Sequence, residues 1–187
     1  MIPPRPTELA HRFVREGLRE GDLAIDATAG NGHDTLMLAE RVGESGRVLA
    51  FDVQSSAIES ARMRIQDSGF QNRVEFHPTS HARMAEFAEP SSAAVVMFNL
   101  GYLPGGDHAL TTEVAETLRG LEAAMICLKP GGLLTVICYP GHAEGSVEAN
   151  AVEDWLQTRC NDGWWLAKYA MLGTRKPAPI LLTASRR

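Results

Sequence analysis

The order of the predicted secondary structure elements is the feature that most restricts how this chain can fold. Short apolar runs, typical of buried strands, alternate with longer segments whose apolar residues recur at helical spacing. The predicted strands cover residues 23–27, 47–53, 74–77, 93–99, 133–139, 164–172 and 180–185. The predicted helices cover residues 7–19, 35–42, 55–68, 82–88, 110–128 and 146–160. This alternation indicates an α/β fold with a parallel sheet covered on both faces, and the last two strands should pair antiparallel.

Three local features sharpen this prediction. Thr7 is the expected N-cap of the first helix. The segment 129–132, with the sequence KPGG, is expected to end the long helix before the next strand begins. In the helix 146–160 the acidic side chains of Glu148, Glu153 and Asp154 are expected to point outward.

Length and composition suit one soluble domain. The chain has 187 residues, so we expect a single domain over 1–187. No apolar run is long enough to span a bilayer, and three scattered cysteines without CxxC spacing argue against a disulfide framework or a metal site. A reducing cytoplasm is the expected compartment.

The charge of the chain limits the partners that it attracts. The formal net charge of −5 gives no global attraction for nucleic acid. A local basic face is still compatible with this total, because several cations fall near the two ends of the chain. These cations are Arg5, Arg12, Arg15, Lys168, Arg175 and Lys176.

The loop after the first predicted strand has the sequence "DATAGNGHDT", from Asp26 to Thr35. Gly30 and Gly32 allow a sharp turn and a close approach of the backbone to a ligand. The next strand ends at Asp52, about 20 residues later, where a carboxylate commonly accepts hydrogen bonds from ribose hydroxyls. Asp26 suits a ligand with a cationic amino group rather than a pyrophosphate. These features favour a nucleoside ligand over a purely structural turn.

A nicotinamide-dependent oxidoreductase is disfavoured, because Thr35 occupies the position of the third glycine in the dinucleotide pattern. The loop, the acid after the second strand and the terminal strand pair instead resemble class I S-adenosylmethionine-dependent methyltransferases. That resemblance implies a Rossmann-like, mostly parallel seven-stranded sheet and S-adenosylmethionine as the cofactor.

More narrowly, "DATAGNGHDT", "FNLGYLPGGD" and "YPGHAEGSVE" resemble a small family of bacterial methylases once labelled "putative rRNA methylase". The family is now associated with methylation of the 5-aminomethyl group of tRNA wobble 2-thiouridine. The resemblance implies a tRNA substrate and a homodimer. It assigns the cofactor to Asp26, Ala29, Gly30, Asn31, Gly32, Asp52, Gln54, Ser80, His81 and Asn99.

The stretch "FNLGYLPGG" follows the apolar run 93–97 and places polar groups at the end of a predicted buried strand. N-methyltransferases of this architecture often have an Asn or Asp, two prolines and an aromatic residue here, and "NLGY" keeps the first and last members. The carboxamide of Asn99 can accept a hydrogen bond from an amine, and Tyr102 can stack on a base. We therefore expect both residues to be catalytic.

The substrate amine must lose a proton before it can attack a methyl group. Tyr139 and His142 are expected pocket residues, and Asp107 is a further candidate to assist, although each can also have a structural role. Three functional hypotheses remain open: a tRNA (or rRNA) N-methyltransferase, a methyltransferase for a small amine, and a nucleoside-binding module without catalysis.

Overall fold

The computed structural model describes residues 2–101, 114–141 and 143–186. The strands within these residues form one seven-stranded sheet. The strand order is β3-β2-β1-β4-β5-β7-β6. The strands are β1 (Leu23–Asp26), β2 (Arg47–Phe51), β3 (Val74–His77), β4 (Ala93–Asn99), β5 (Leu128–Cys138), β6 (Trp164–Ala170) and β7 (Ile180–Arg186). Strands β1 to β5 pair in parallel, and β7 pairs antiparallel with both β5 and β6. The predicted mostly parallel sheet with an antiparallel terminal pair is confirmed.

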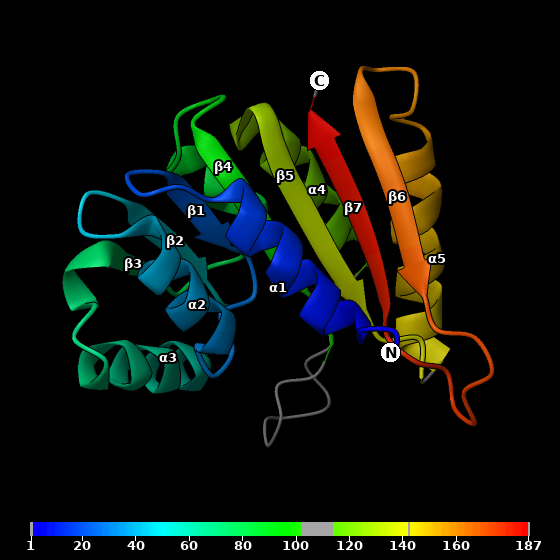
Figure 1. Cartoon of the computed structure of the whole chain (residues 1–187), viewed down its shortest axis with the longest axis horizontal. Coiled ribbons are helices and arrows are strands. Elements are labelled where there is room, and N and C mark those ends of the chain that lie inside the picture. Colours follow the sequence, from blue (N-terminus) through cyan, green and yellow to red (C-terminus); the bar gives the residue numbers. More distant parts are fainter. Residues whose placement is uncertain (1, 102–113, 142, 187) are drawn as a thin grey trace.

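The helices cover both faces of this sheet. They are α1 (Pro6–Gly17), α2 (His33–Val42), α3 (Ser55–Asp67), α4 (Val114–Cys127) and α5 (Ala143–Gln157), with two short 3-10 helices, η1 (Gln71–Arg73) and η2 (His81–Glu86). Buried residues of α1, α2 and α3 pack in one apolar cluster against β1, β2 and β4. Residues of α4 and α5 pack in a second cluster on the opposite face. Figure 1 shows α1 crossing the front of the sheet, with α4 and α5 behind it.

Strand β4 explains why the middle of the sheet is so apolar. All of its residues from Ala93 to Phe98 are buried, as expected for a central strand that helices cover on both faces. Only Asn99, at its carboxyl end, is partly exposed. The strand order reverses between β1 and β4, so the carboxyl ends of these two neighbours flank the usual ligand position of an open α/β sheet.

Three local predictions are corrected by the structure. Strand β5 begins at Leu128, so the KPGG segment lies inside the strand as an irregularity, where Ala93 faces Leu128 and Val95 already faces Leu133. Helix α1 begins at Pro6, and Glu8 rather than Thr7 acts at its start, because the Glu8 carboxylate accepts the Arg5 backbone N–H at 3.0 Å. Glu148 points inward and accepts a hydrogen bond from the Thr117 hydroxyl at 2.7 Å.

Candidate functional site

The loop between β1 and α2 is shaped by two glycines with positive φ. Gly30 has φ of 48° and Gly32 has φ of 77°, a region that favours glycine. A Cβ atom at Gly32 would lie 2.7 Å from the Cα of Ala61 on α3, so a side chain there would also separate α2 from α3. The loop is thereby held close to the carboxyl ends of β1 and β2, and the N–H of Ala29 donates to the Phe51 carbonyl at 2.8 Å.

Asp26 lies beneath this loop and is 1% exposed. Its Oδ1 accepts the Thr28 backbone N–H at 3.1 Å, and its Oδ2 accepts the Thr35 hydroxyl at 2.5 Å. Burial raises the pKa of Asp26 to about 7, with a further increase from the charge of Asp34, although both hydrogen bonds oppose the change. Near neutral pH the carboxyl group of Asp26 is therefore partly protonated, and a nearby cation would favour its ionised form.

Asp52 connects the first loop to the start of α3. Its Oδ2 accepts the Gly30 N–H at 2.9 Å, and its Oδ1 accepts the Gln54 N–H at 2.9 Å. A carboxylate offers about four acceptor positions, so capacity remains for two ribose hydroxyls. The neighbouring Val53 side chain is 63% exposed and presents an apolar surface beside that carboxylate. These residues fit a nucleoside with a free ribose.

The remaining predicted cofactor residues lie around this loop with different roles. The carbonyl of Asn31 accepts a hydrogen bond from Arg64 Nε at 2.7 Å. Ser80 caps η2 by accepting the Ala82 N–H at 3.1 Å, and its hydroxyl donates to Glu116. His81 is buried against the ring of Phe98, with 5.2 Å between ring centroids, and burial lowers its pKa. The assignment of Ser80 and His81 to an adenine contact stays a prediction.

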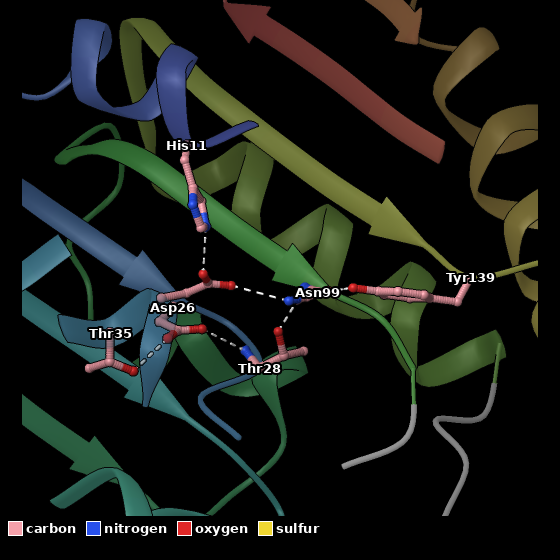
Figure 2. Close-up of polar contacts among 7 residues, drawn as sticks. His11, Asp26, Thr28, Thr35, Asn99 and Tyr139 are labelled. Carbon is pink, nitrogen blue, oxygen red and sulfur yellow. Dashed lines mark hydrogen bonds and ion pairs between the residues drawn. The ribbon is translucent and has the colours of Figure 1, made fainter. Parts of the chain in front are cut away.

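Asn99 is the centre of a polar network at the end of β4, drawn in Figure 2. Its backbone N–H donates to the Thr28 hydroxyl at 2.7 Å, which ties β4 to the glycine loop. Its Nδ2 donates to Asp34 Oδ2 at 3.2 Å, and its Oδ1 accepts the Tyr139 hydroxyl at 2.8 Å. An ionised carboxylate can only accept hydrogen bonds. The amide nitrogen of Asn99 must therefore face Asp34, and its oxygen faces Tyr139.

Tyr139 lies at the carboxyl end of β5, next to Asn99. Burial and the charge of Asp34 raise the pKa of Tyr139, so its phenol is neutral and donates to Asn99. The ring packs on Gly101, where an added Cβ would approach Tyr139 Cδ2 to 3.1 Å. The glycine in "NLGY" therefore leaves room for the phenol ring.

The structure also brings in residues that the sequence interpretation did not assign. His11 of α1 contacts Asp34 of α2, with 2.7 Å between Nε2 and Oδ1. Thr28 forms hydrogen bonds with both Asn99 and Asp26, and Thr35 forms one with Asp26. Asp34 lies within the "DATAGNGHDT" motif, in the first turn of α2, which is a signal that could have identified it. His11 had no such signal, because a polar residue on an amphipathic helix is usually a solvent-facing one.

Three predicted residues cannot be placed. Tyr102, Asp107 and His142 lie outside the described residues, so their expected roles stay predictions. Among the residues that the structure describes, no group of three or more His, Cys, Asp or Glu side chains could hold a metal ion. Within the same residues, no helix has the length and apolar character needed to cross a membrane.

The sheet order, the glycine loop after β1 and the carboxylate after β2 together define a class I S-adenosylmethionine-dependent methyltransferase. The chain belongs to the family described as "Putative rRNA methylase", whose model matches residues 48–185. It is 37% identical to an Arabidopsis thaliana protein named tRNA (mnm(5)s(2)U34)-methyltransferase, chloroplastic, over 98% of this chain and 70% of that one.

Two solved structures share this fold over the full length of both chains. One is described as a putative rRNA-methylase from Clostridium thermocellum, with 33% identity and a TM-score of 0.97. The other is SMU.1697c, described as a putative methyltransferase from Streptococcus mutans in complex with SAH, with 28% identity and a TM-score of 0.90. The expected enzyme class and the expected cofactor are therefore confirmed.

Proposed function

We propose that this methyltransferase acts on tRNA and methylates the amine of a 5-aminomethyl group on wobble (2-thio)uridine. The observation that carries the proposal is the fixed amide of Asn99, whose carbonyl oxygen lies at the end of β4 beside the cofactor loop. An acceptor in this position can bind an amine N–H, whereas a carbon nucleophile has no N–H to donate to it. The name of the Arabidopsis relative supports the choice of substrate.

The described residues supply the binding functions that such a reaction needs. Asp26 and the 29–32 loop would hold the methionine part of the cofactor, and Asp52 with Gln54 would hold its ribose. S-adenosylmethionine supplies an electrophilic methyl group on a sulfonium centre. The carbonyl oxygen of Asn99 has a second lone pair beside the one that Tyr139 occupies, and this lone pair would orient the amine. Placement of this kind contributes several kcal/mol to catalysis.

We further propose that basic residues near the site form an RNA-binding surface. Arg5, in the N-terminal segment, and Arg175 with Lys176, between β6 and β7, are exposed. Figure 1 shows both segments near the carboxyl end of the parallel strand β5. Two observations support this placement. The Tyr169 hydroxyl donates to the Pro4 carbonyl at 2.8 Å, and Gly141 lies close enough to Pro177 that an added Cβ would be 3.7 Å from the Pro177 carbonyl oxygen.

Further parts of the proposal concern assembly and location. We propose that residues 1–187 act as a single methyltransferase domain, as a homodimer in the cytoplasm, in line with the family resemblance. The exposed side chain of Trp165 on the edge strand β6 is compatible with a second copy at this edge. The relative from Arabidopsis is named as chloroplastic, so location is a point on which the two proteins can differ.

The family description favours a second candidate, in which the target lies in rRNA. Nucleoside mass spectrometry of RNA from cells lacking this protein separates the two. The tRNA proposal predicts loss of the methylaminomethyl nucleoside and accumulation of its aminomethyl precursor in the tRNA fraction. Unchanged tRNA nucleosides together with a lost methylation in rRNA would overturn it. Restoration by the plasmid-borne wild-type gene, and not by a cofactor-site variant, is the matched control.

A further inference from the structure

The hydrogen-bond network at Asn99 continues beyond the residues that the proposed function uses. Asp34 Oδ2 accepts a hydrogen bond from Asn99 Nδ2 at 3.2 Å, and Asp34 Oδ1 lies 2.7 Å from His11 Nε2. The side chain of Asp34 is 12% exposed and that of His11 is 31% exposed. The chain of contacts therefore runs from a nearly buried carboxylate at the site to an imidazole that reaches solvent, as Figure 2 shows for His11 and Asn99.

An amine substrate creates a need that this chain of contacts can meet. A primary alkyl amine, like the side chain of lysine, is mostly an ammonium ion near neutral pH. An ammonium ion has no lone pair, so one proton must leave before nitrogen can attack. Histidine is the side chain best suited to exchange a proton in this pH range, and a carboxylate bonded to it orients its ring.

We propose that the His11–Asp34 pair is the proton acceptor for the substrate amine. This inference rests on the proposed function. The Asp34 carboxylate, beside Asn99, takes the proton from the ammonium group and passes it from Oδ1 to Nε2 of His11. This transfer needs a neutral His11 ring whose own proton is on Nδ1, and the imidazolium that forms then releases a proton to solvent. The freed lone pair on nitrogen forms the new N–C bond. The C–S bond breaks with its electron pair on sulfur, and the product leaves as a secondary ammonium ion.

The surrounding charges are compatible with this assignment. Asp34 interacts with titratable groups on three elements, His11 on α1, Asp26 on β1 and Tyr139 after β5, and Asp52 after β2 acts on Asp26. Asp26 and Asp52 are carboxyl groups, and in their ionised form they attract a cationic substrate. Burial and the charge of Asp34 raise the pKa of Tyr139, so its phenol stays neutral and does not take up the amine proton. It remains a hydrogen-bond donor to Asn99.

Two simpler roles would produce the same contacts. His11 and Asp34 could only hold α1 against α2, or Asp34 could bind the amino group of the cofactor. The variant His11→Gln tests the first role, because glutamine can form a hydrogen bond with Asp34 but cannot take up a proton. The variant Asp34→Asn tests the second role through its cofactor affinity. Glu16→Gln is the matched control, since Glu16 is an exposed residue on the same helix.

The experiment measures single-turnover methyl transfer to tRNA bearing the aminomethyl precursor, from pH 6.5 to 9.5, with S-adenosylhomocysteine affinity from calorimetry. We expect His11→Gln and Asp34→Asn to bind S-adenosylhomocysteine within about twofold of wild type. Their rates should fall roughly 10- to 100-fold at pH 7, and this loss should shrink toward pH 9.5, where solvent supplies more free amine. Glu16→Gln should match wild type at every pH.

Several results would overturn the inference. A His11→Gln variant with the wild-type rate and pH profile would reduce the pair to a structural contact, as would failure of both His11→Gln and His11→Ala to fold. A loss of S-adenosylhomocysteine affinity above about tenfold in Asp34→Asn would assign the carboxylate to the cofactor. Absence of transfer by the wild-type enzyme itself would instead refute the proposed function, and the inference with it.

Discussion

Asp52 shows how one side chain can organise a site and still bind a ligand. It holds the Gly30 and Gln54 N–H groups at 2.9 Å each, and these groups belong to two different loops. We expect Asp52→Ala to weaken S-adenosylmethionine binding by about 1.5–3 kcal/mol, the usual contribution of a hydrogen bond to a charged group. Calorimetry measures this directly. Asp67→Ala, an exposed carboxylate at the end of α3, is the control, and equal affinities in the two folded variants would remove Asp52 from the site.

Asp26 gives the site a dependence on pH. Its pKa is 3.8 as the reference value for the unfolded chain and about 7 in the folded protein. Between these values the unfolded chain loses the proton first, so the contribution of Asp26 to stability is complete below pH 3.8 and declines until about pH 7. We expect Asp26→Asn to lack this decline, which amounts to a few kcal/mol. Urea unfolding of both proteins, without ligand, from pH 5 to 8 measures the difference, and parallel curves would contradict it.

The sequence allowed a prediction only for those site residues that belong to a recognisable motif. Asp26, Gly32 and Asp52 could be assigned because a glycine turn and an acid about 20 residues later follow from how a ribose is held at the ends of parallel strands. Asn99 could be assigned because a carboxamide at the end of a buried strand needs a partner. His11 could not, because its contact with Asp34 depends on how α1 crosses the sheet, which residue spacing within α1 does not specify.

At the scale of whole elements, the carboxyl ends of β4 and β5 form one unit. The pairing of Asn99 with Ile137 brings the next residues of both strands together, and Gly101 lets the Tyr139 ring lie against the chain. We expect Gly101→Ala to displace the ring by a few tenths of an ångström and to weaken the Tyr139 hydrogen bond to Asn99. The methyl-transfer rate should fall while cofactor affinity changes little, which single-turnover assays and calorimetry distinguish.

A matched variant makes that test specific. Tyr139→Phe removes the same hydrogen bond without crowding the ring, so Gly101→Ala and Tyr139→Phe should lower the rate by similar factors, roughly 10-fold. Gly131→Ala is the control, because the Cβ of that residue would meet no atom within 4 Å, although its φ of 76° predicts a small loss of stability. A wild-type rate in Tyr139→Phe would contradict the role assigned to the phenol.

The elements themselves were largely predictable, and the errors have physical causes. Strands β3 and β4 were predicted with their observed bounds, because their apolar runs are bounded by polar or turn residues. The start of β5 was missed, because Pro130 and two glycines usually end pairing, whereas here the strand bulges around them and continues. Glu148 was expected outside, and its hydrogen bond with Thr117 of α4 makes the buried position tolerable.

At the scale of the whole molecule, RNA binding requires a local basic surface, because the net charge of −5 gives no overall attraction for RNA. Charge reversal at Arg175 and Lys176 together should lower tRNA affinity and reduce the steepness of its salt dependence, because fewer counterions are released on binding. Cofactor affinity should not change. Reversal of Arg47 and Arg62, two exposed arginines elsewhere on the surface, is the control. An unchanged salt slope after reversal of Arg175 and Lys176 would place the RNA-binding face elsewhere, and Arg12 and Arg15 would be tested next.

The most direct test of the account examines, in one assay, whether the substrate amine is required and whether Asn99 is required. Labelled methyl transfer is measured under single-turnover conditions to tRNA with the aminomethyl precursor, and to the same tRNA without it. We predict transfer only to the first tRNA, with a methylaminomethyl nucleoside as the product. Asn99→Ala should fold and bind S-adenosylmethionine nearly normally, but transfer roughly 10- to 1,000-fold more slowly. Equal transfer to both tRNAs, or a wild-type rate in Asn99→Ala, would contradict the account.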